Sequence, residues 1–170
     1  MEENEIINRV ASSALTVFNL EDHYPTGEMA VIDLKDLLFQ GLILREKDLR
    51  DFTKDHDWQN YQDKNVAVYC SADAVIPTWA FMLVAISLQP FARKIHFGNR
   101  EELLSALYDA ALAIVDWEKF KGAKVVIKGC GDVQVPPSAY LTAATRLRPL
   151  AASILYGEPC STVPLYKKLK

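Results

Sequence analysis

The stretch Val66-Ala-Val-Tyr-Cys70-Ser-Ala-Asp73-Ala-Val-Ile-Pro77 decides the fold of this chain, because it joins a β-rich run to the start of an apolar helix. Residues 66–69 predict a strand. Residues 77–89 predict a helix, since proline is favoured in a first helical turn, where its missing N–H would have no partner. The strongly apolar composition of this helix indicates that it is buried in the core.

The same alternation continues towards the C-terminus. Residues 94–97 and 124–128 predict two further strands. A helix follows each strand: one begins near Asn99, and the other runs from Ser138 to a stop at Gly157. A connection that leaves one strand, passes through a helix and returns to the next strand usually joins parallel strands, in a right-handed sense. The sequence therefore predicts an α/β fold with a mixed sheet, whose C-terminal βαβαβα half is parallel.

The first sixty residues show a less regular pattern. Residues 15–20 and 29–34 predict two extended segments, and the turn-rich residues 24–27 between them predict an N-terminal hairpin that extends the sheet. Residues 37–44 are compatible with a strand or a helix, and residues 45–55 predict a charged helix.

Composition narrows the class of protein. Half of the 170 residues are hydrophobic and 24% are charged, which is enough apolar material for a single domain over residues 1–170. The first residues are acidic and then amphipathic, unlike a signal peptide, so we expect a cytoplasmic protein. The apolar run at residues 79–88 is too short to cross a bilayer, and no recognised nucleic-acid-binding motif is present. Neither a membrane nor a nucleic acid is therefore an expected partner.

The three cysteines, Cys70, Cys130 and Cys160, lie in similar local sequences, each followed by a proline a few residues later. An aspartate also follows the first two, Asp73 and Asp132. An odd number of distant cysteines without an export signal argues against a disulfide framework. Reduced thiols and metal ligands are the remaining alternatives.

The three cysteines can form a metal site if the fold brings them close together. Cys70 and Cys130 both come after predicted strands, at the sheet edge where open α/β sheets usually bind ligands. If the C-terminal segment returns Cys160 to that edge, three thiolates and a fourth ligand can hold a zinc ion or an iron–sulfur cluster. Asp73 and Asp132 are then cofactor-binding candidates that orient the thiolates. This hypothesis makes the protein a metal- or iron–sulfur-binding accessory protein.

Other interpretations stay open at this point. The fourth ligand could be one of the two aspartates, or His23, His56 or His96. The cysteines could instead be small core residues, with the aspartates as helix caps. A reactive thiol at the start of a helix is a third, enzymatic alternative.

Charge is distributed unevenly, with a net charge of −10 over residues 1–118 and +7 over residues 119–170. The two parts can attract each other within the chain, or one of them can bind a charged partner. The competing functional hypothesis is therefore a non-catalytic protein interaction module with structural cysteines. The sequence does not predict an oligomeric state.

Four phrases of the sequence resemble a known family. They are Asp33-Leu-Lys-Asp-Leu-Leu-Phe-Gln-Gly41, Tyr69-Cys-Ser-Ala-Asp-Ala-Val-Ile-Pro-Thr-Trp79, Val126-Ile-Lys-Gly-Cys-Gly-Asp132 and Gly157-Glu-Pro-Cys-Ser-Thr-Val-Pro-Leu-Tyr166. The phrases are similar to those of an uncharacterised bacterial family, domain-of-unknown-function family 2480, and the likeness covers nearly the whole chain. No reaction is assigned to that family. Its genes tend to neighbour iron–sulfur assembly genes, so the resemblance implies an association with proteins of iron–sulfur assembly.

Overall fold

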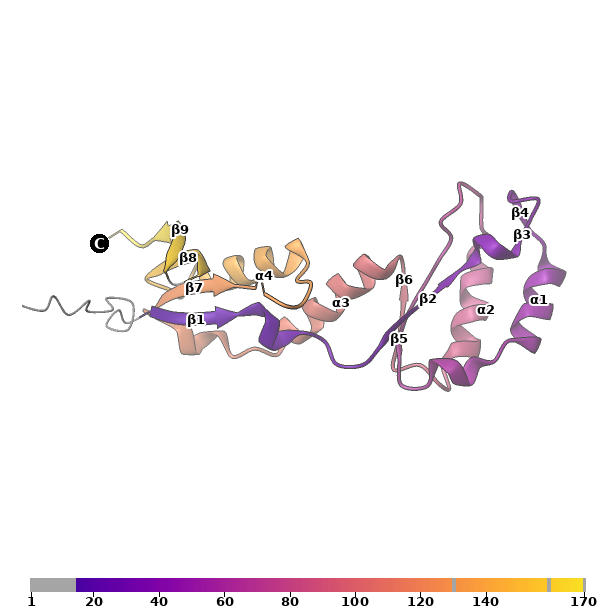
Figure 1. Cartoon of the computed structure of the whole chain (residues 1–170), viewed down its shortest axis with the longest axis horizontal. Coiled ribbons are helices and arrows are strands. Elements are labelled where there is room, and N and C mark those ends of the chain that lie inside the picture. The colour runs from indigo at the N-terminus through magenta and orange to yellow at the C-terminus, as the bar shows by residue number, and fades with distance from the viewer. Residues whose placement is uncertain (1–14, 130, 159, 170) are drawn as a thin grey trace, which may run out of the picture. The chain divides into compact units, whose positions relative to one another are not determined.

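The computed structural model describes residues 15–129, 131–158 and 160–169, and the chain divides into two compact units (Figure 1). We call Thr26–Ala106 the inserted unit, because in the sequence it separates the two segments of the other unit. Those segments, Met1–Pro25 and Leu107–Lys170, form what we call the terminal unit. Each unit has its own sheet, so each is described separately.

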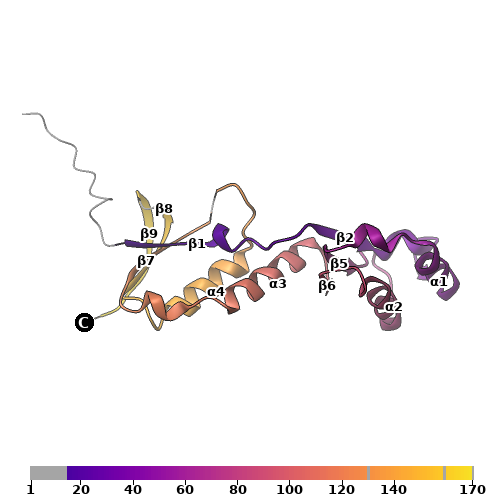
Figure 2. The same cartoon turned by 90° about the horizontal axis from the view of Figure 1, so that it is seen from below.

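The inserted unit contains a three-stranded parallel sheet in the order β2-β5-β6. Its strands are β2 (Met29–Asp33), β5 (Asn65–Tyr69) and β6 (Lys94–Phe97). The helices α1 (Glu46–Asp55) and α2 (Thr78–Leu88) lie side by side in both views (Figures 1 and 2). The short strands β3 (Leu38–Phe39) and β4 (Ile43–Leu44) pair in antiparallel fashion before α1.

Burial in the inserted unit follows from its sequence. The central strand β5 places Val66, Ala67 and Val68 in the interior, because helices and neighbouring strands surround a middle strand of a parallel sheet. Side chains from the two helices complete the same core, which includes Leu49 and Leu88, both fully buried. At about 1.5–3 kcal/mol for each large apolar side chain removed from water, this burial is the main stabilising contribution to the unit.

The terminal unit contains a four-stranded sheet in the order β1-β7-β8-β9. Its strands are β1 (Leu15–Asn19), β7 (Lys124–Lys128), β8 (Ser153–Glu158) and β9 (Ser161–Lys167). The first three are parallel, and β9 returns antiparallel to β8. The helix α4 (Pro137–Leu147) packs against β7 (Figure 2).

The helix α3 (Arg100–Ala113) contributes residues to both units. It begins at the predicted capping pattern: the Asn99 side chain accepts hydrogen bonds from the backbone N–H groups of Glu101 and Glu102. In return, the Glu102 carboxylate accepts a hydrogen bond from the Asn99 backbone N–H at 2.8 Å. These reciprocal bonds satisfy N–H groups that have no partner within the helix.

The two units are copies of one arrangement, with equivalent residues 59 positions apart from Trp58–Asn99 to Trp117–Glu158. The same residue type recurs at several equivalent positions: Trp58 and Trp117, Asp73 and Asp132, Pro77 and Pro136, Leu88 and Leu147, Pro90 and Pro149, Gly98 and Gly157. Strand register recurs too. Asn65 pairs with Lys94 in the inserted unit, and the equivalent Lys124 pairs with Ser153 in the terminal unit.

Hydrogen bonds support this internal repeat. The indole Nε1 of Trp58 donates to the Thr53 carbonyl at 2.9 Å, and the equivalent Trp117 Nε1 donates to the Leu112 carbonyl at 3.2 Å. The first strands also correspond, because each ends in a polar residue that caps a short 3₁₀ helix. Asn19 does so after β1, and Asp33 after β2.

The structure confirms the predicted α/β class with parallel strands, but several predicted details differ. The predicted N-terminal hairpin does not form, because β1 pairs with β7 and β2 pairs with β5. The helix predicted to run to Gly157 ends at Leu147, just before Pro149, and the following residues form β8. The residues 37–44, for which helix and strand were both open, include the paired strands β3 and β4.

Among the described residues, none of the helices has the length and apolar character needed to cross a membrane.

Candidate functional site

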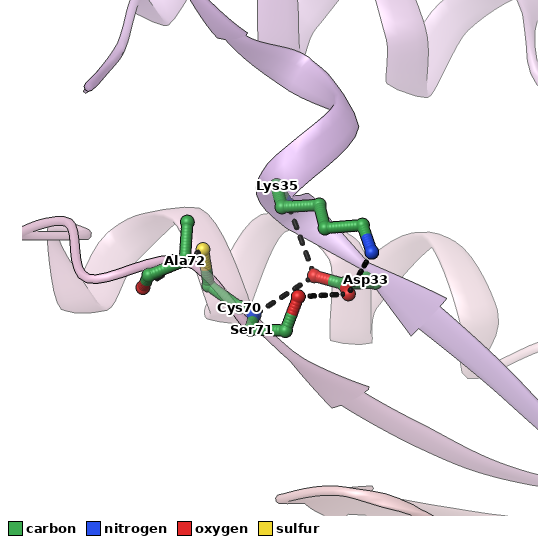
Figure 3. Close-up of polar contacts among 5 residues, drawn as sticks. All are labelled: Asp33, Lys35, Cys70, Ser71 and Ala72. Atoms are coloured by element: carbon green, nitrogen blue, oxygen red, sulfur yellow. Dashed lines mark hydrogen bonds and ion pairs between the residues drawn. The ribbon is translucent and has the colours of Figure 1, made fainter. Parts of the chain in front are cut away.

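The carboxyl ends of the neighbouring strands β2 and β5 carry a polar cluster built on Asp33 (Figure 3). Its carboxylate accepts two hydrogen bonds from Ser71, from the hydroxyl at 2.6 Å and from the backbone N–H at 3.0 Å. The Lys35 backbone N–H also donates to it at 3.1 Å, and the Lys35 Nζ lies 3.6 Å away. Asp33 therefore ties the start of the loop after β5 to the end of β2.

These contacts determine the ionisation of Asp33. Burial alone would raise the pKa of the carboxyl, but the hydrogen bonds from Ser71 and Lys35 outweigh burial and lower the pKa below its ordinary value of 3.8. The carboxylate stays ionised at neutral pH. Because it holds two loops together through several donors, its role is to fix the loop geometry.

Cys70 begins the loop held by Asp33. It is half-buried and packs against the core of the inserted unit, and its Sγ lies 3.8 Å from the carbonyl oxygen of Ala72 (Figure 3). A small, weakly polar side chain in this position fills space at the end of a strand. The structure therefore supports the interpretation of Cys70 as a packing residue.

The predicted three-cysteine site is not supported. In the described part of the chain, His, Cys, Asp and Glu side chains form no group of three or more that could hold a metal. Cys70 belongs to the inserted unit, whereas Cys160 is exposed at the turn between β8 and β9 in the terminal unit. Cys130 lies outside the described residues. The hypothesis of an accessory protein that holds a metal or cluster through these three cysteines is therefore wrong.

The error has a physical cause in the internal repeat. The prediction placed the strands before Cys70 and Cys130 in one sheet, but β5 and β7 belong to different sheets. The 59-residue spacing makes Gly129, not Cys130, the counterpart of Cys70. Only Asp73 and Asp132 are equivalent, and both are exposed. The recurring local sequence reflects a repeated strand–helix connection, and whether zinc or an iron–sulfur cluster binds elsewhere stays a prediction.

The three histidines, which were candidates for a fourth ligand, have different surroundings. His23 packs on Phe18, with ring centroids 5.0 Å apart, and burial lowers its pKa. His56 lies in an aromatic cluster, where its Nε2 is 3.1 Å from the Tyr61 hydroxyl. His96 lies in β6. His23 and His56 are thus held by aromatic packing, and His96 lines the cavity beside α2.

A second feature of the inserted unit is an exposed apolar surface on α2 and β6, which the sequence did not predict. We call the side chains of Trp79, Met82, Ile86 and Phe97 the α2–β6 surface. Met82, Ile86 and Phe97 are 59%, 69% and 70% exposed, respectively. The interpretation of α2 as a fully buried helix was therefore wrong for one face, while Ala80, Val84 and Leu88 on the other face are buried. Trp79, Met82 and Ile86 share one face of α2 by helical spacing, and Met82 and Phe97 line the same cavity. Exposed apolar side chains arranged in this way indicate a surface for interaction.

A cavity of about 640 Å³ adjoins this surface. Its walls come from α2, β5 and β6. Phe81, Met82 and Ala85 lie on the helix, and Ile95 and Phe97 lie on β6. Phe81 and Phe97 meet edge to face, with ring centroids 4.9 Å apart. The lining is mostly apolar, so the cavity suits apolar side chains better than a charged ligand.

In the terminal unit, a further strand covers the edge that corresponds to the outer edge of β6, while Leu141 and Thr145 on α4, the equivalents of Met82 and Ile86, are exposed. There the equivalent strand, β8, pairs with the antiparallel β9, which places Leu165 and Tyr166 beside α4. The Arg148 guanidinium stacks 3.7 Å from the centroid of the Tyr166 ring, and a smaller cavity of about 330 Å³ remains. In the described part of the inserted unit, no strand pairs with the outer edge of β6. Within the described residues, the edge of β6 thus lacks the covering strand that the edge of β8 has.

The hydrogen bonds that the Asp33 carboxylate accepts give one prediction. Replacing Asp33 with asparagine should lower the free energy of unfolding by about 1–2 kcal/mol at pH 7, because hydrogen bonds to a charged acceptor become neutral ones. The pKa of Asp33 is lower in the folded protein than in the unfolded chain. The carboxylate therefore contributes fully to the free energy of unfolding above pH 3.8, and this contribution is lost as the pH falls through the pKa of the folded protein. Urea unfolding of both proteins at pH 7, 5 and 3 should show the difference shrinking only at the lowest pH. A difference that does not change with pH would contradict this role.

Comparison with known proteins places the chain in a family. Residues 4–168 match the sequence model of a family described as a protein of unknown function, DUF2480. Neither the curated proteins nor the solved structures provided a match. The match covers nearly the whole chain, both units and the α2–β6 surface included. The chain therefore belongs to the DUF2480 family, whose function is unknown.

Proposed function

We propose that the protein is a non-catalytic interaction module that binds another polypeptide through the α2–β6 surface. The observation that carries this proposal is the exposed apolar face of α2, next to a cavity and to the outer edge of β6, with which no strand of the described residues pairs. That the partner comes from iron–sulfur assembly stays a prediction.

Two physical arguments support a polypeptide as the ligand. The surface combines an apolar cavity with a strand edge whose backbone N–H and C=O groups can pair with an extended chain. The sequence of α2, Thr78–Leu88, contains no charged residue, so binding there requires no desolvation of charge on the helix. A small polar metabolite would use neither feature.

The repeat offers a matched control for testing the surface. A photo-crosslinking amino acid in place of Met82 should form an adduct with a polypeptide when the full chain is irradiated in its native host cells. The same amino acid in place of Leu141, the repeat equivalent of Met82 and 66% exposed, should not. Adding Ile86→Asp should reduce the Met82 adduct at least tenfold, because it places a charge in the apolar contact. Equal adducts at both positions, or none at either, would show that the surface is not a binding site.

A further inference from the structure

We propose that the polypeptide bound at the α2–β6 surface is a second copy of this chain, joined through antiparallel pairing of the two β6 strands. The inference rests on the proposed function and identifies its partner. It follows from the internal repeat, from the symmetry of strand pairing, from the charge of the surface and from its size.

The repeat indicates which kind of structure covers this edge. In the terminal unit, the outer edge of β8 is covered by an antiparallel strand, whose Leu165 and Tyr166 adjoin the helix. β6 is the equivalent of β8, with Lys94 corresponding to Ser153. An antiparallel strand is therefore the cover that this arrangement accepts.

A second copy supplies such a strand by symmetry. Two identical strands related by a two-fold axis perpendicular to a sheet run antiparallel, so β6 can pair with β6 and join two three-stranded sheets. An axis at His96 sets Ile95 of each copy opposite Phe97 of the other. Both side chains line the cavity beside α2, so the pairing would bring the two cavities and the two helices to the same face of the joined sheet.

Charge is compatible with self-association. Two copies of α2 can approach without repulsion, because the helix has no charged side chain. Lys94, the only Lys or Arg in β6, has its Nζ 3.3 Å from the Ala106 carbonyl of its own chain. The edge strands of the two sheets are β1, β2, β6 and β9, and β9 differs from β6 because Pro164 and a register irregularity interrupt it. Those features protect an edge from pairing, and β6 has no proline.

The size of the surface allows a weak dimer. At roughly 100 Å² of exposed surface for each of its four large side chains, two copies would bury about 800 Å². The backbone and remaining side chains of β6 would add to this area, towards the about 1,000 Å² that a specific interface requires. The dimer would thus be modest in area, with Met82, Ile86 and Phe97 as its apolar centre.

Sedimentation velocity of the full chain at 1–100 µM tests this inference. The native protein should sediment as a species of twice the 19.1 kDa chain mass. Ile86→Asp should raise the dissociation constant at least tenfold, whereas Thr145→Asp, at the equivalent exposed position of α4, should change it less than twofold. Circular dichroism should show that both variants keep the native helix content. Dimerisation that Ile86→Asp leaves unchanged would overturn the inference.

The pairing itself is tested by cysteine crosslinking. Under mild oxidation, His96→Cys should form a symmetric disulfide between two copies, because the residue lies at the proposed two-fold axis. Leu155→Cys, its equivalent in the covered strand β8, should not. A native protein that stays monomeric at 100 µM, and whose Met82 adduct contains only another protein, would overturn the second-copy inference while leaving the proposed function intact. A monomer without any adduct would overturn both.

Discussion

Replacing Leu88 with alanine is expected to lower the free energy of unfolding by about 2–5 kcal/mol, because the substitution removes a fully buried side chain and leaves a cavity. Leu88 is the last residue of α2 and belongs to the core of the inserted unit. Its repeat equivalent, Leu147, is the last residue of α4 and is also fully buried. Leu147→Ala should therefore cost a similar amount, which chemical unfolding of both variants would measure.

The two leucine substitutions should destabilise different parts of the chain. Each leucine lies in a separate unit, so hydrogen exchange should become faster in β5 and α2 for Leu88→Ala, and in β7 and α4 for Leu147→Ala. Ile86→Asp is a suitable control, because Ile86 is exposed on the same helix and its replacement should leave the exchange of β5 unchanged. Equal acceleration in all four elements after either leucine substitution would contradict two separate cores.

Most secondary structure could be predicted from the sequence because its signals are local. The strands at residues 66–69, 94–97 and 124–128 are short runs rich in β-branched or aromatic residues, and β5, β6 and β7 lie there. Proline before α2 and the Asn99 capping pattern before α3 located two helix starts for the same reason. The predicted end of a helix was wrong where the local pattern fitted both helix and strand. Ala151 and Ile154 continue the helical spacing beyond Pro149, but pairing with β7 makes Ile154 part of a strand.

The parallel pairing of β5 with β6 agrees with the prediction, but the partners of β1, β2 and β7 could not be predicted, because they depend on contacts between residues distant in sequence. The segments at β1 and β2 are neighbours along the chain, which favoured a hairpin. Each instead pairs with a later strand of its own unit, in the same register relative to the repeat: Leu15 with Lys124, and Met29 with Asn65. The 59-residue spacing was the available signal, since an equivalent pair such as Trp58 and Trp117 is visible in the sequence.

The predicted three-cysteine site was wrong because the similar sequences around the cysteines belong to an internal repeat and do not converge on one site. The shared Asp and Pro positions before α2 and α4 maintain the same connection in two units, and the cysteines do not occupy equivalent positions within it. The apolar composition of α2 was visible, but its exposure was not. A helix that is apolar on all sides is expected to be buried on all sides. Only the sheet order, in which β6 is an edge strand, shows that one side of α2 has no cover within the described part of its unit.

Replacing Gly157 with alanine is expected to lower the free energy of unfolding by about 3 kcal/mol, mainly through the pairing of β8 with β9. The backbone φ angle of Gly157 is +115°, which residues with a side chain rarely adopt. A Cβ atom would also lie 2.7 Å from the Ser161 carbonyl oxygen, a backbone atom held in the facing strand. Urea unfolding would measure the loss, and faster exchange of β9 amides would locate it.

Gly98 provides the matched control, because it is the repeat equivalent of Gly157 and has a φ of +136°. Alanine there meets the carboxylate end of Glu102, a side chain that can move away at the cost of its hydrogen bond from the Asn99 N–H. Gly98→Ala should therefore cost about 1–2 kcal/mol less than Gly157→Ala, since both share the backbone strain and only one meets a fixed backbone atom. If Gly98→Ala were the more destabilising of the two, the covering strand β9 would not be what constrains Gly157. The proposed difference between β8, which β9 covers, and β6, which no described strand covers, would then not explain the behaviour of the two glycines.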